Sequence, residues 1–296
     1  MPSFRNAKSQ AKHALKQNLS IGTARHGHAK DNKVHSLGTQ RSYTQALTHV
    51  TQWLQDNRLG DLKSLNQATA LNYLEQRSQT VGQKTLDQER QAIQIYLQIK
   101  LPVIKSELEQ AVKSRAYTDA QVSLIAQAQT AKHRLATQIA LTAGLRAHEL
   151  FTLRRKEEQA MSSHRVWLSN RFIGREGQIY TVIGKGGLIR EVLIPTHLAQ
   201  ALESKRLSQP ITVKDRTIKY TQHYAIGGGK DWSNSFSAAS QRVLGWSHGA
   251  HGLRHSYAQI RMEELQQQGF HYESALQIVS QALGHFRAEI TKVYLR

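Results

Sequence analysis

A single block of β-prone sequence interrupts a chain that otherwise carries the apolar spacing of α-helices. Residues 166–194 hold short runs of Val, Ile, Leu and Tyr separated by five glycines, a pattern typical of antiparallel strands and turns. Outside this block, apolar residues recur at intervals of three and four, as on one face of a helix. The sequence therefore predicts a mainly α-helical protein with a small antiparallel β-sheet, an α+β fold.

The helical pattern divides into two parts, which we interpret as two domains. Residues 35–113 contain three amphipathic stretches that end near residues 55, 77 and 99, and Thr39 or Ser42 is a candidate cap for the first. A new helix start follows at Thr118, where Gln121 completes a capping box. We expect a helical domain over 35–113, a boundary at 113–117 and a second domain over 117–296. From residue 199 onward we expect helices again, apart from a loop at 227–229.

The charge of the chain indicates its partner. Forty Lys and Arg outnumber 21 Asp and Glu, which gives a formal net charge of +19 at pH 7. Such a chain repels itself until a polyanion neutralises it, and binding to nucleic acid gains free energy from released counterions. An anionic membrane is the alternative, but we find no long apolar stretch, signal peptide or lipidation motif. We expect a soluble, intracellular protein with no membrane partner.

The first 34 residues are the most basic part of the chain. They carry seven Lys and Arg against one acid, Asp31, and their apolar residues are sparse and irregular. We expect a basic N-terminal arm over 1–34 that is poorly ordered alone. Such an arm either folds along phosphates or stays a solvated tail, and the sequence favours neither.

Cysteine is absent, which excludes disulfides, thiolate nucleophiles and cysteine zinc sites. The 15 histidines raise the question of a metal site. His251 and His255 are four residues apart and would share one face of a helix. However, Gly252 stands where the metalloprotease motif needs a glutamate. We therefore expect no metal and no cofactor.

Four short motifs contain the candidate catalytic residues. The first is G-L-R-A-H-E-L at 144–150, and the second is G-K-G-G at 184–187, which lacks the remainder of a phosphate-binding P-loop. The third is H-G-L-R-H at 251–255, and the fourth is L-G-H at 283–285 with a tyrosine nine residues later. Taken singly, Arg146, Lys185 and Tyr294 each fit an ordinary surface or core residue.

Taken together and in this order, the motifs resemble the active-site series of the tyrosine recombinases, the lambda-integrase-like or phage integrase family. The resemblance covers roughly residues 117–296, and residues 35–113 resemble the family's helical core-binding domain more loosely. The sequence departs from the family pattern by extra residues near 266–272 and by having only two residues after Tyr294, where many relatives have another helix. The resemblance implies that the catalytic residues are Arg146, Lys185, His251, Arg254, His285 and Tyr294.

The chemistry implied by the resemblance is the breaking and rejoining of DNA strands by a site-specific recombinase or integrase. The Tyr294 hydroxyl would attack the scissile phosphate and conserve the bond energy as a 3′-phosphotyrosine. Arg146 and Arg254 would bind the non-bridging oxygens with permanently charged, bidentate donors. Lys185 would protonate the leaving 5′ oxygen.

The remaining candidates would support this reaction. His251 and His285 would add hydrogen bonds to the phosphate, and a neutral imidazole would accept the tyrosine proton. We expect Glu149 to orient Arg146 or His255, and His255 to be a structural hydrogen-bonding group.

The resemblance further implies double-stranded DNA as the partner and a homo-tetramer on paired DNA sites, with accessory DNA-bending proteins as further candidates. It places the protein in the bacterial cytoplasm or nucleoid, in the service of a mobile genetic element. Two alternatives stay open, a catalytically silent DNA-binding protein of recombinase descent and a type IB topoisomerase-like DNA-relaxing enzyme. A metal-dependent nuclease is disfavoured because no carboxylate cluster is evident.

Overall fold

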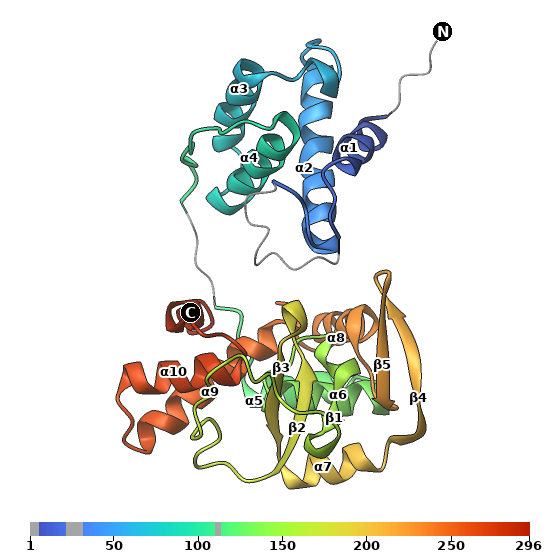
Figure 1. Ribbon diagram of the computed structural model, residues 1–296. Coiled ribbons are helices and arrows are strands. Elements are labelled where there is room, and N and C mark those ends of the chain that lie inside the picture. Colours follow the sequence, from blue (N-terminus) through green and yellow to red (C-terminus); the bar gives the residue numbers. More distant parts are fainter. Residues whose placement is uncertain (1–5, 22–31, 110–113) are drawn as a thin grey trace. The chain divides into compact units, whose positions relative to one another are not determined.

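The computed structural model describes residues 6–21, 32–109 and 114–296 (Figure 1). The chain divides into two compact units, Met1–Ala111 and Val112–Arg296, which we call unit 1 and unit 2. The predicted boundary at 113–117 begins just after this division, and its first residue lies outside the described residues. The prediction of a mainly helical protein with a small antiparallel sheet is confirmed.

Unit 1 is helical throughout its described elements. It contains α1 (Ala7–Lys16), α2 (Leu37–Asp56), the short 3-10 helix η1 (Leu62–Ser64), α3 (Gln67–Ser78) and α4 (Gln83–Leu97). Ser36 caps α2 by accepting a hydrogen bond from the Thr39 N–H, so the predicted caps at Thr39 or Ser42 were wrong. Asn66 and Thr69 form a capping box at α3. The apolar faces of these helices pack into a single core.

Helix α1 corrects the prediction of a poorly ordered arm. Ala7, Ala11 and Leu15 are spaced by four residues and are buried, and the Asn6 side chain caps the helix. The apolar signal was weak because two of the three buried residues are alanines. Other residues of the predicted arm, 1–5 and 22–31, lie outside the described residues.

A buried ion pair joins α3 to α4. The Glu89 side chain is almost completely buried, and it accepts hydrogen bonds from Arg77 Nε at 3.0 Å and Arg77 Nη2 at 2.9 Å. The Tyr73 hydroxyl donates a third hydrogen bond to the same carboxylate, at 2.9 Å. Burial, then the charge of Glu89, raises the pKa of Tyr73, so the phenol stays protonated and keeps donating.

Unit 2 begins with two helices and a three-stranded sheet. Its first elements are α5 (Asp119–Gln127), capped by Thr118 as predicted, α6 (Ala131–Thr142) and the 3-10 helix η2 (Glu149–Thr152). The antiparallel sheet has the order β1-β2-β3, formed by β1 (Arg154–Arg155), β2 (Gln178–Ile183) and β3 (Ile189–Ile194). The 3-10 helix η3 (Lys156–Glu158) follows β1, and the 3-10 turn η4 (Lys185–Gly187) joins β2 to β3. The β-prone residues Val166 and Leu168 lie outside these strands.

A second sheet in unit 2 was missed. After α7 (Thr196–Glu203), strands β4 (Arg206–Asp215) and β5 (Ile218–Tyr224) form an antiparallel hairpin where helices were expected. The turn of this hairpin consists of Arg216 and Thr217, both at positive φ. Because neither Gly, Asn nor Pro marks that turn, the usual sequence signal for a hairpin is missing.

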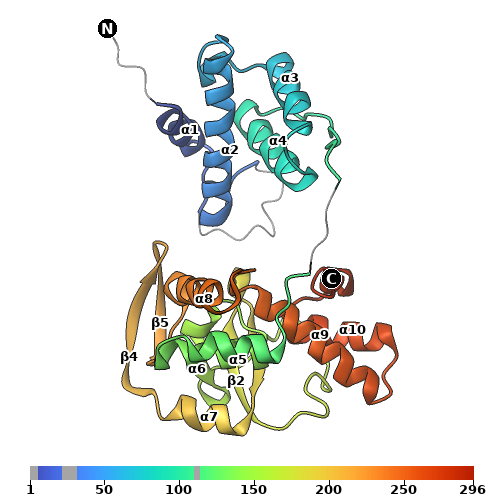
Figure 2. The ribbon, with the colours of Figure 1, turned by 180° about the vertical axis from the view of Figure 1, so that it is seen from behind.

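Helices complete unit 2. They are α8 (Gly229–Leu244), α9 (Gly252–Gln267), α10 (Tyr272–Ala282) and α11 (Ala288–Lys292), and Figure 2 shows α9 and α10 beside each other from behind. Residues 227 and 228 form the predicted glycine loop, and a short turn over 268–271 takes up the extra residues expected near 266–272. One core lies among α5, α6, the first sheet and α8, and a second lies between α9 and α10.

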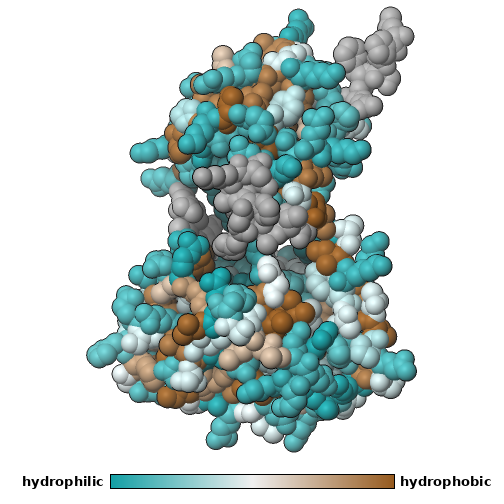
Figure 3. All heavy atoms as spheres, viewed as in Figure 1, coloured by the Kyte–Doolittle hydropathy of each residue, from teal (hydrophilic) through white to brown (hydrophobic). Residues whose placement is uncertain are grey.

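The visible face of each unit is mostly hydrophilic, with smaller apolar patches between the polar side chains (Figure 3). In the described part of the chain, no helix is both long and apolar enough to cross a membrane.

Candidate active site

The first motif begins with a tight turn after α6. Gly144 adopts a φ of 59°, and a Cβ there would lie 2.7 Å from the Tyr257 ring and 3.0 Å from Leu283. Only glycine fits this turn without strain or collision. The motif is thereby pressed against α9 and the end of α10, which carry the third and fourth motifs.

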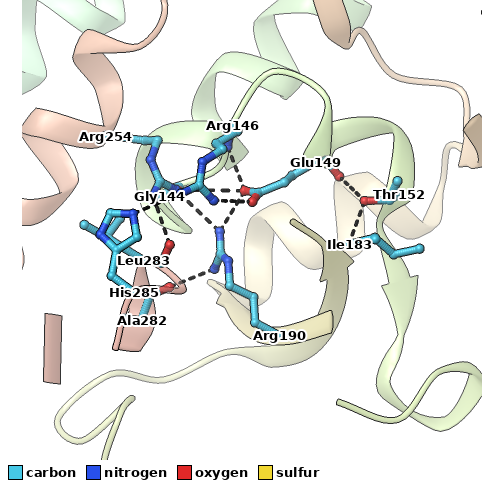
Figure 4. Close-up of polar contacts among 10 residues, drawn as sticks. All are labelled: Gly144, Arg146, Glu149, Thr152, Ile183, Arg190, Arg254, Ala282, Leu283 and His285. Carbon is cyan, nitrogen blue, oxygen red and sulfur yellow. Dashed lines mark hydrogen bonds and ion pairs between the residues drawn. The ribbon is translucent and has the colours of Figure 1, made fainter. Parts of the chain in front are cut away.

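Glu149 is the centre of the polar network in Figure 4. Its side chain is 0% exposed, and Oε1 accepts a hydrogen bond from Arg146 Nη1 at 2.8 Å. Oε2 accepts from the Arg146 backbone N–H and from Arg190 Nη2, each at 2.8 Å. Glu149 thus orients Arg146, one of the two roles expected for it, and no hydrogen bond joins it to His255 among the described residues.

Three guanidiniums surround this one carboxylate, because Arg254 Nη1 also lies 3.9 Å from Glu149 Oε2. Burial alone would raise the pKa of Glu149, but the neighbouring positive charges, first that of Arg190, outweigh it and hold the pKa well below its usual value. The carboxylate is therefore ionised at neutral pH. It compensates one of the three positive charges, so the cluster keeps a net charge of about +2 and favours an anionic ligand.

Arg190 was not predicted as a site residue. Its side chain is 1% exposed and donates to two residues of the first motif, Glu149 and the Gly144 carbonyl at 3.4 Å, and to the Ala282 carbonyl just before the fourth motif at 2.8 Å (Figure 4). Arg190 lies on β3, six residues after Gly184 of the second motif. An arginine between apolar strand residues looks like a solvent-facing position, and only its closeness to the second motif could have marked it.

Arg254 is fixed by main-chain acceptors. Its side chain is 0% exposed, Nη1 donates to the Gly144 carbonyl, and Nη2 donates to the Leu283 carbonyl at 3.0 Å. Burial, then the repulsion from Arg146, lowers the pKa of Arg254 to about 10, which leaves it charged at neutral pH. Its Nε is buried and has no hydrogen-bond partner within the described residues.

His285 is bound to the first motif. Its Nε2 lies 3.0 Å from Arg146 Nη2. A guanidinium can only donate, so Nε2 is the acceptor and the ring proton is on Nδ1. Nδ1 has no hydrogen-bond partner in the described part of the chain. Burial, then the charge of Arg254, lowers the pKa of His285 to about 3, so the imidazole is neutral at pH 7.

Tyr294 lies among the other motif residues and is 8% exposed. Its ring centroid is 5.6 Å from that of His285, 5.7 Å from that of His251 and 4.8 Å from that of His255. The guanidinium carbon of Arg254 lies 5.6 Å from the same ring centroid. The structure thus brings the third and fourth motifs together around this tyrosine, and His285 links them to Arg146 of the first motif.

His255 of α9 and His251, which directly precedes this helix, are also neutral at pH 7. Partial burial, then the charge of Arg254, lowers the pKa of His251 to about 4. Burial, then the charge of Arg115, lowers the pKa of His255 to about 4. The His255 ring packs on the Tyr294 ring, 4.8 Å between centroids, which gives it a positioning contact with that residue. No group of three or more histidines and carboxylates arranged to hold a metal ion is found among residues 6–21, 32–109 and 114–296.

Lys185 stands apart from the other predicted residues. It is exposed in the turn between β2 and β3, and none of its side-chain contacts joins it to the other five predicted catalytic residues. Its neighbour Gly184 is close to the network, since a Cβ there would lie 3.1 Å from Glu149 Oε1 and 3.8 Å from Arg146 Nη1. The backbone therefore places the lysine at the rim of the site with its side chain directed into solvent.

The structure resembles those of known site-specific recombinases. XerH site-specific recombinase, bound to palindromic difH substrate in a post-cleavage complex, aligns with a TM-score of 0.58 and 14% identity over 99% of this chain and 94% of that chain. A lambda integrase tetramer bound to a Holliday junction aligns with a TM-score of 0.54 and 13% identity over 97% of this chain and 80% of that chain. No protein-family model and no curated protein sequence matches the chain.

At 13–14% identity, the similarity to these two structures shows a shared fold and no more. The resemblance inferred from the motifs is confirmed to that extent, because both proteins are tyrosine recombinases and both alignments include nearly the whole chain. The chain has the fold of the tyrosine recombinases.

Proposed function

We propose that the chain is a site-specific DNA recombinase or integrase that cuts and rejoins DNA through a 3′-phosphotyrosine on Tyr294. The observation that supports this most directly is the position of the Tyr294 ring, beside three neutral imidazoles and the guanidinium of Arg254. A phenol, neutral bases and fixed positive charges are the groups that a metal-free attack on a phosphodiester needs.

In the proposed first step, the Tyr294 oxygen forms a bond to phosphorus while the bond from phosphorus to the 5′ oxygen breaks. Arg146 and Arg254 stabilise the charge that gathers on the non-bridging oxygens. The excess positive charge around Glu149 makes this stabilisation strong, because donors fixed in advance need no reorganisation during the reaction. Removing one such donor from an enzyme site typically slows the reaction by about 100- to 1,000-fold.

The proton of the tyrosine passes to an imidazole. His285 and His251 are weak bases in the free protein, because nearby guanidiniums lower their pKa values to about 3 and about 4. A bound phosphate offsets those charges and raises both pKa values, so the bases gain strength when the substrate is present. His285 Nε2 already accepts a hydrogen bond from Arg146, so we assign the proton transfer to His251, a hydrogen bond to the phosphate to His285, and the support of Tyr294 to His255.

The leaving 5′ oxygen receives its proton from Lys185. The lysine is on a glycine-flanked turn, and the φ of 75° at Gly186 and 80° at Gly187 gives this turn a shape that other residues rarely adopt. Its long side chain can swing from solvent over the neighbouring Arg146. In the second step a 5′ hydroxyl of another strand returns the proton to Lys185, attacks the phosphotyrosine and releases Tyr294.

Double-stranded DNA and a homo-tetramer on paired sites are the proposed partners. The formal charge of +19 supports a polyanionic partner. The similar structures contain XerH on its difH substrate and a lambda integrase tetramer on a Holliday junction, which supports the same assembly here. Accessory proteins and service to a mobile element stay part of the proposal.

The test is covalent capture. Wild-type protein, Tyr294→Phe and the matched control Tyr272→Phe, an exposed tyrosine on α10, are each incubated with nicked fragments of the source genome. Detergent-stable protein–DNA adducts are then isolated and sequenced. We expect wild type and Tyr272→Phe to give adducts at a restricted set of sites, with or without EDTA, and Tyr294→Phe to give none. Equal adducts with Tyr294→Phe would refute the assignment of the nucleophile.

A further inference from the structure

The β4–β5 hairpin of unit 2 has one face attached to the fold. Tyr220 on this face packs on His148 and Phe151, with ring centroids 6.2 Å and 5.5 Å away. Asp215 accepts a hydrogen bond from the backbone N–H of Lys230 at 3.1 Å. Because side chains alternate along a strand, the residues between these contacts lie on the opposite face.

That opposite face carries a pair of facing lysines. The strand register places Lys214 opposite Lys219 and Thr212 opposite Thr221, and all four side chains are exposed. Among the ion pairs of the described residues, none involves Lys214 or Lys219. Like charges directly across two strands are destabilising, so this arrangement costs stability unless an anion lies over it.

The turn at the tip of the hairpin also lowers the stability of the protein. Arg216 has a φ of 49° and Thr217 a φ of 75°. This left-handed region suits glycine or asparagine, and it is particularly unfavourable for a β-branched residue such as threonine. A strained turn that carries an exposed arginine is better explained by a binding role than by folding alone.

We propose that the outer face of the β4–β5 hairpin binds the phosphate backbone of DNA as a contact separate from the candidate active site. Lys214 and Lys219 would each bind a phosphate, with hydroxyls from Thr212 and Thr221 beside them and Arg216 at the tip. This proposal rests on the DNA recombinase function proposed for the site in unit 2, and it adds one specific DNA contact to that function.

The shape and place of the hairpin support DNA as the ligand. In Figures 1 and 2 the tip of the hairpin lies at the same end of unit 2 as the chain's C terminus. The donors lie along an open ribbon, without the enclosed pocket that would hold a small anion. DNA presents about one charge per 1.7 Å of its axis, and a two-stranded ribbon fits its major groove.

The test is the salt dependence of DNA binding, measured by fluorescence anisotropy with full-length protein and a labelled duplex. The double variant Lys214→Gln, Lys219→Gln is compared with wild type and with the control Lys205→Gln, an exposed lysine that directly precedes β4. Each phosphate contact contributes about 0.9 to the slope of log K against log salt. We therefore expect the slope of the double variant to fall by about 1.8, and that of the control to be unchanged.

This difference in slope implies that the double variant binds DNA ~60-fold more weakly than wild type at 0.1 M salt and almost equally well at 1 M. Its unfolding temperature should equal or exceed that of wild type, because the repulsive lysine pair is gone. If the double variant keeps the wild-type salt slope, the proposed hairpin contact is refuted. The covalent adducts on Tyr294 would then still support the proposed function. Absence of both adducts and salt-dependent binding in wild type would instead remove the proposed function itself.

Discussion

Replacing Glu149 by glutamine tests whether one buried carboxylate holds the candidate active site together. The glutamine keeps one oxygen acceptor but loses the negative charge, and its amide hydrogens then face Arg146 or Arg190. Removing one partner of a buried ion pair typically costs about 3–5 kcal/mol, because the remaining charges stay buried without compensation. Three guanidiniums would be left together here, so we expect a loss at the upper end of that range.

The assay is thermal unfolding followed by circular dichroism at pH 7. A loss of this size should lower the unfolding temperature of unit 2 by about 10–20 °C, since 1 kcal/mol shifts a domain of 150–250 residues by roughly 2–4 °C. The matched control is Glu158→Gln, which removes a partly exposed carboxylate paired with Arg206. Surface pairs contribute at most about 1 kcal/mol, so the control should shift by only a few degrees.

The pH dependence has a definite sign. The pKa of Glu149 is lowered in the folded protein, so its stabilising contribution is complete above the unfolded value of about 4.3 and is lost as pH falls below it. The difference between wild type and Glu149→Gln should therefore be constant from pH 5 to 8 and narrow below about pH 4. Equal unfolding temperatures at pH 7, or a difference that grows as the solution is acidified, would refute the reasoning.

Three further outcomes are expected. Gly144→Ala should lower the free energy of unfolding, measured in urea, by about 2–5 kcal/mol, because the new Cβ adds a collision with Tyr257 to an unfavourable left-handed backbone conformation. The control Gly245→Ala has the same kind of φ but no atom near its Cβ, so it should lose only about 1–2 kcal/mol. Equal losses would contradict the close packing of the first motif. The His285 ring carbons should show no titration between pH 5 and 8 by NMR, and a midpoint near 6.5 would disprove its neutral state. Glu89→Gln should destabilise unit 1 by about 3–5 kcal/mol, seen as faster hydrogen exchange in α3 and α4, and unchanged exchange would contradict the role of that ion pair.

Much of the site could be anticipated because its residues lie in contiguous motifs with local signals. A glycine that ends a helix places Arg146, and a helical repeat of four places His251 and His255 on one face. The motif order then indicates which segments meet, and the structure brings them together around Tyr294. The position of the Lys185 side chain could not be anticipated, because a glycine-rich turn has many accessible conformations and no packing contact selects one.

The missed features depend on contacts between distant parts of the chain. Arg190 is buried by the first and fourth motifs, and nothing on its own strand indicates partners 41 and 92 residues away. The β4–β5 turn lacks the residues that normally mark a hairpin, so its apolar strand residues were assigned to helices. Helix α1 was missed because alanine contributes little apolar signal yet packs closely against α2.

Arg254 and Arg190 are held largely by peptide carbonyls, at Gly144, Ala282 and Leu283. Every residue type supplies such an acceptor, so substitutions along these segments can accumulate without releasing either guanidinium, provided the backbone keeps its path. An anchoring scheme of this kind leaves little trace in the amino-acid sequence. It permits wide divergence of the sequence within one fold, in accordance with 13–14% identity across an alignment that extends over nearly the whole chain.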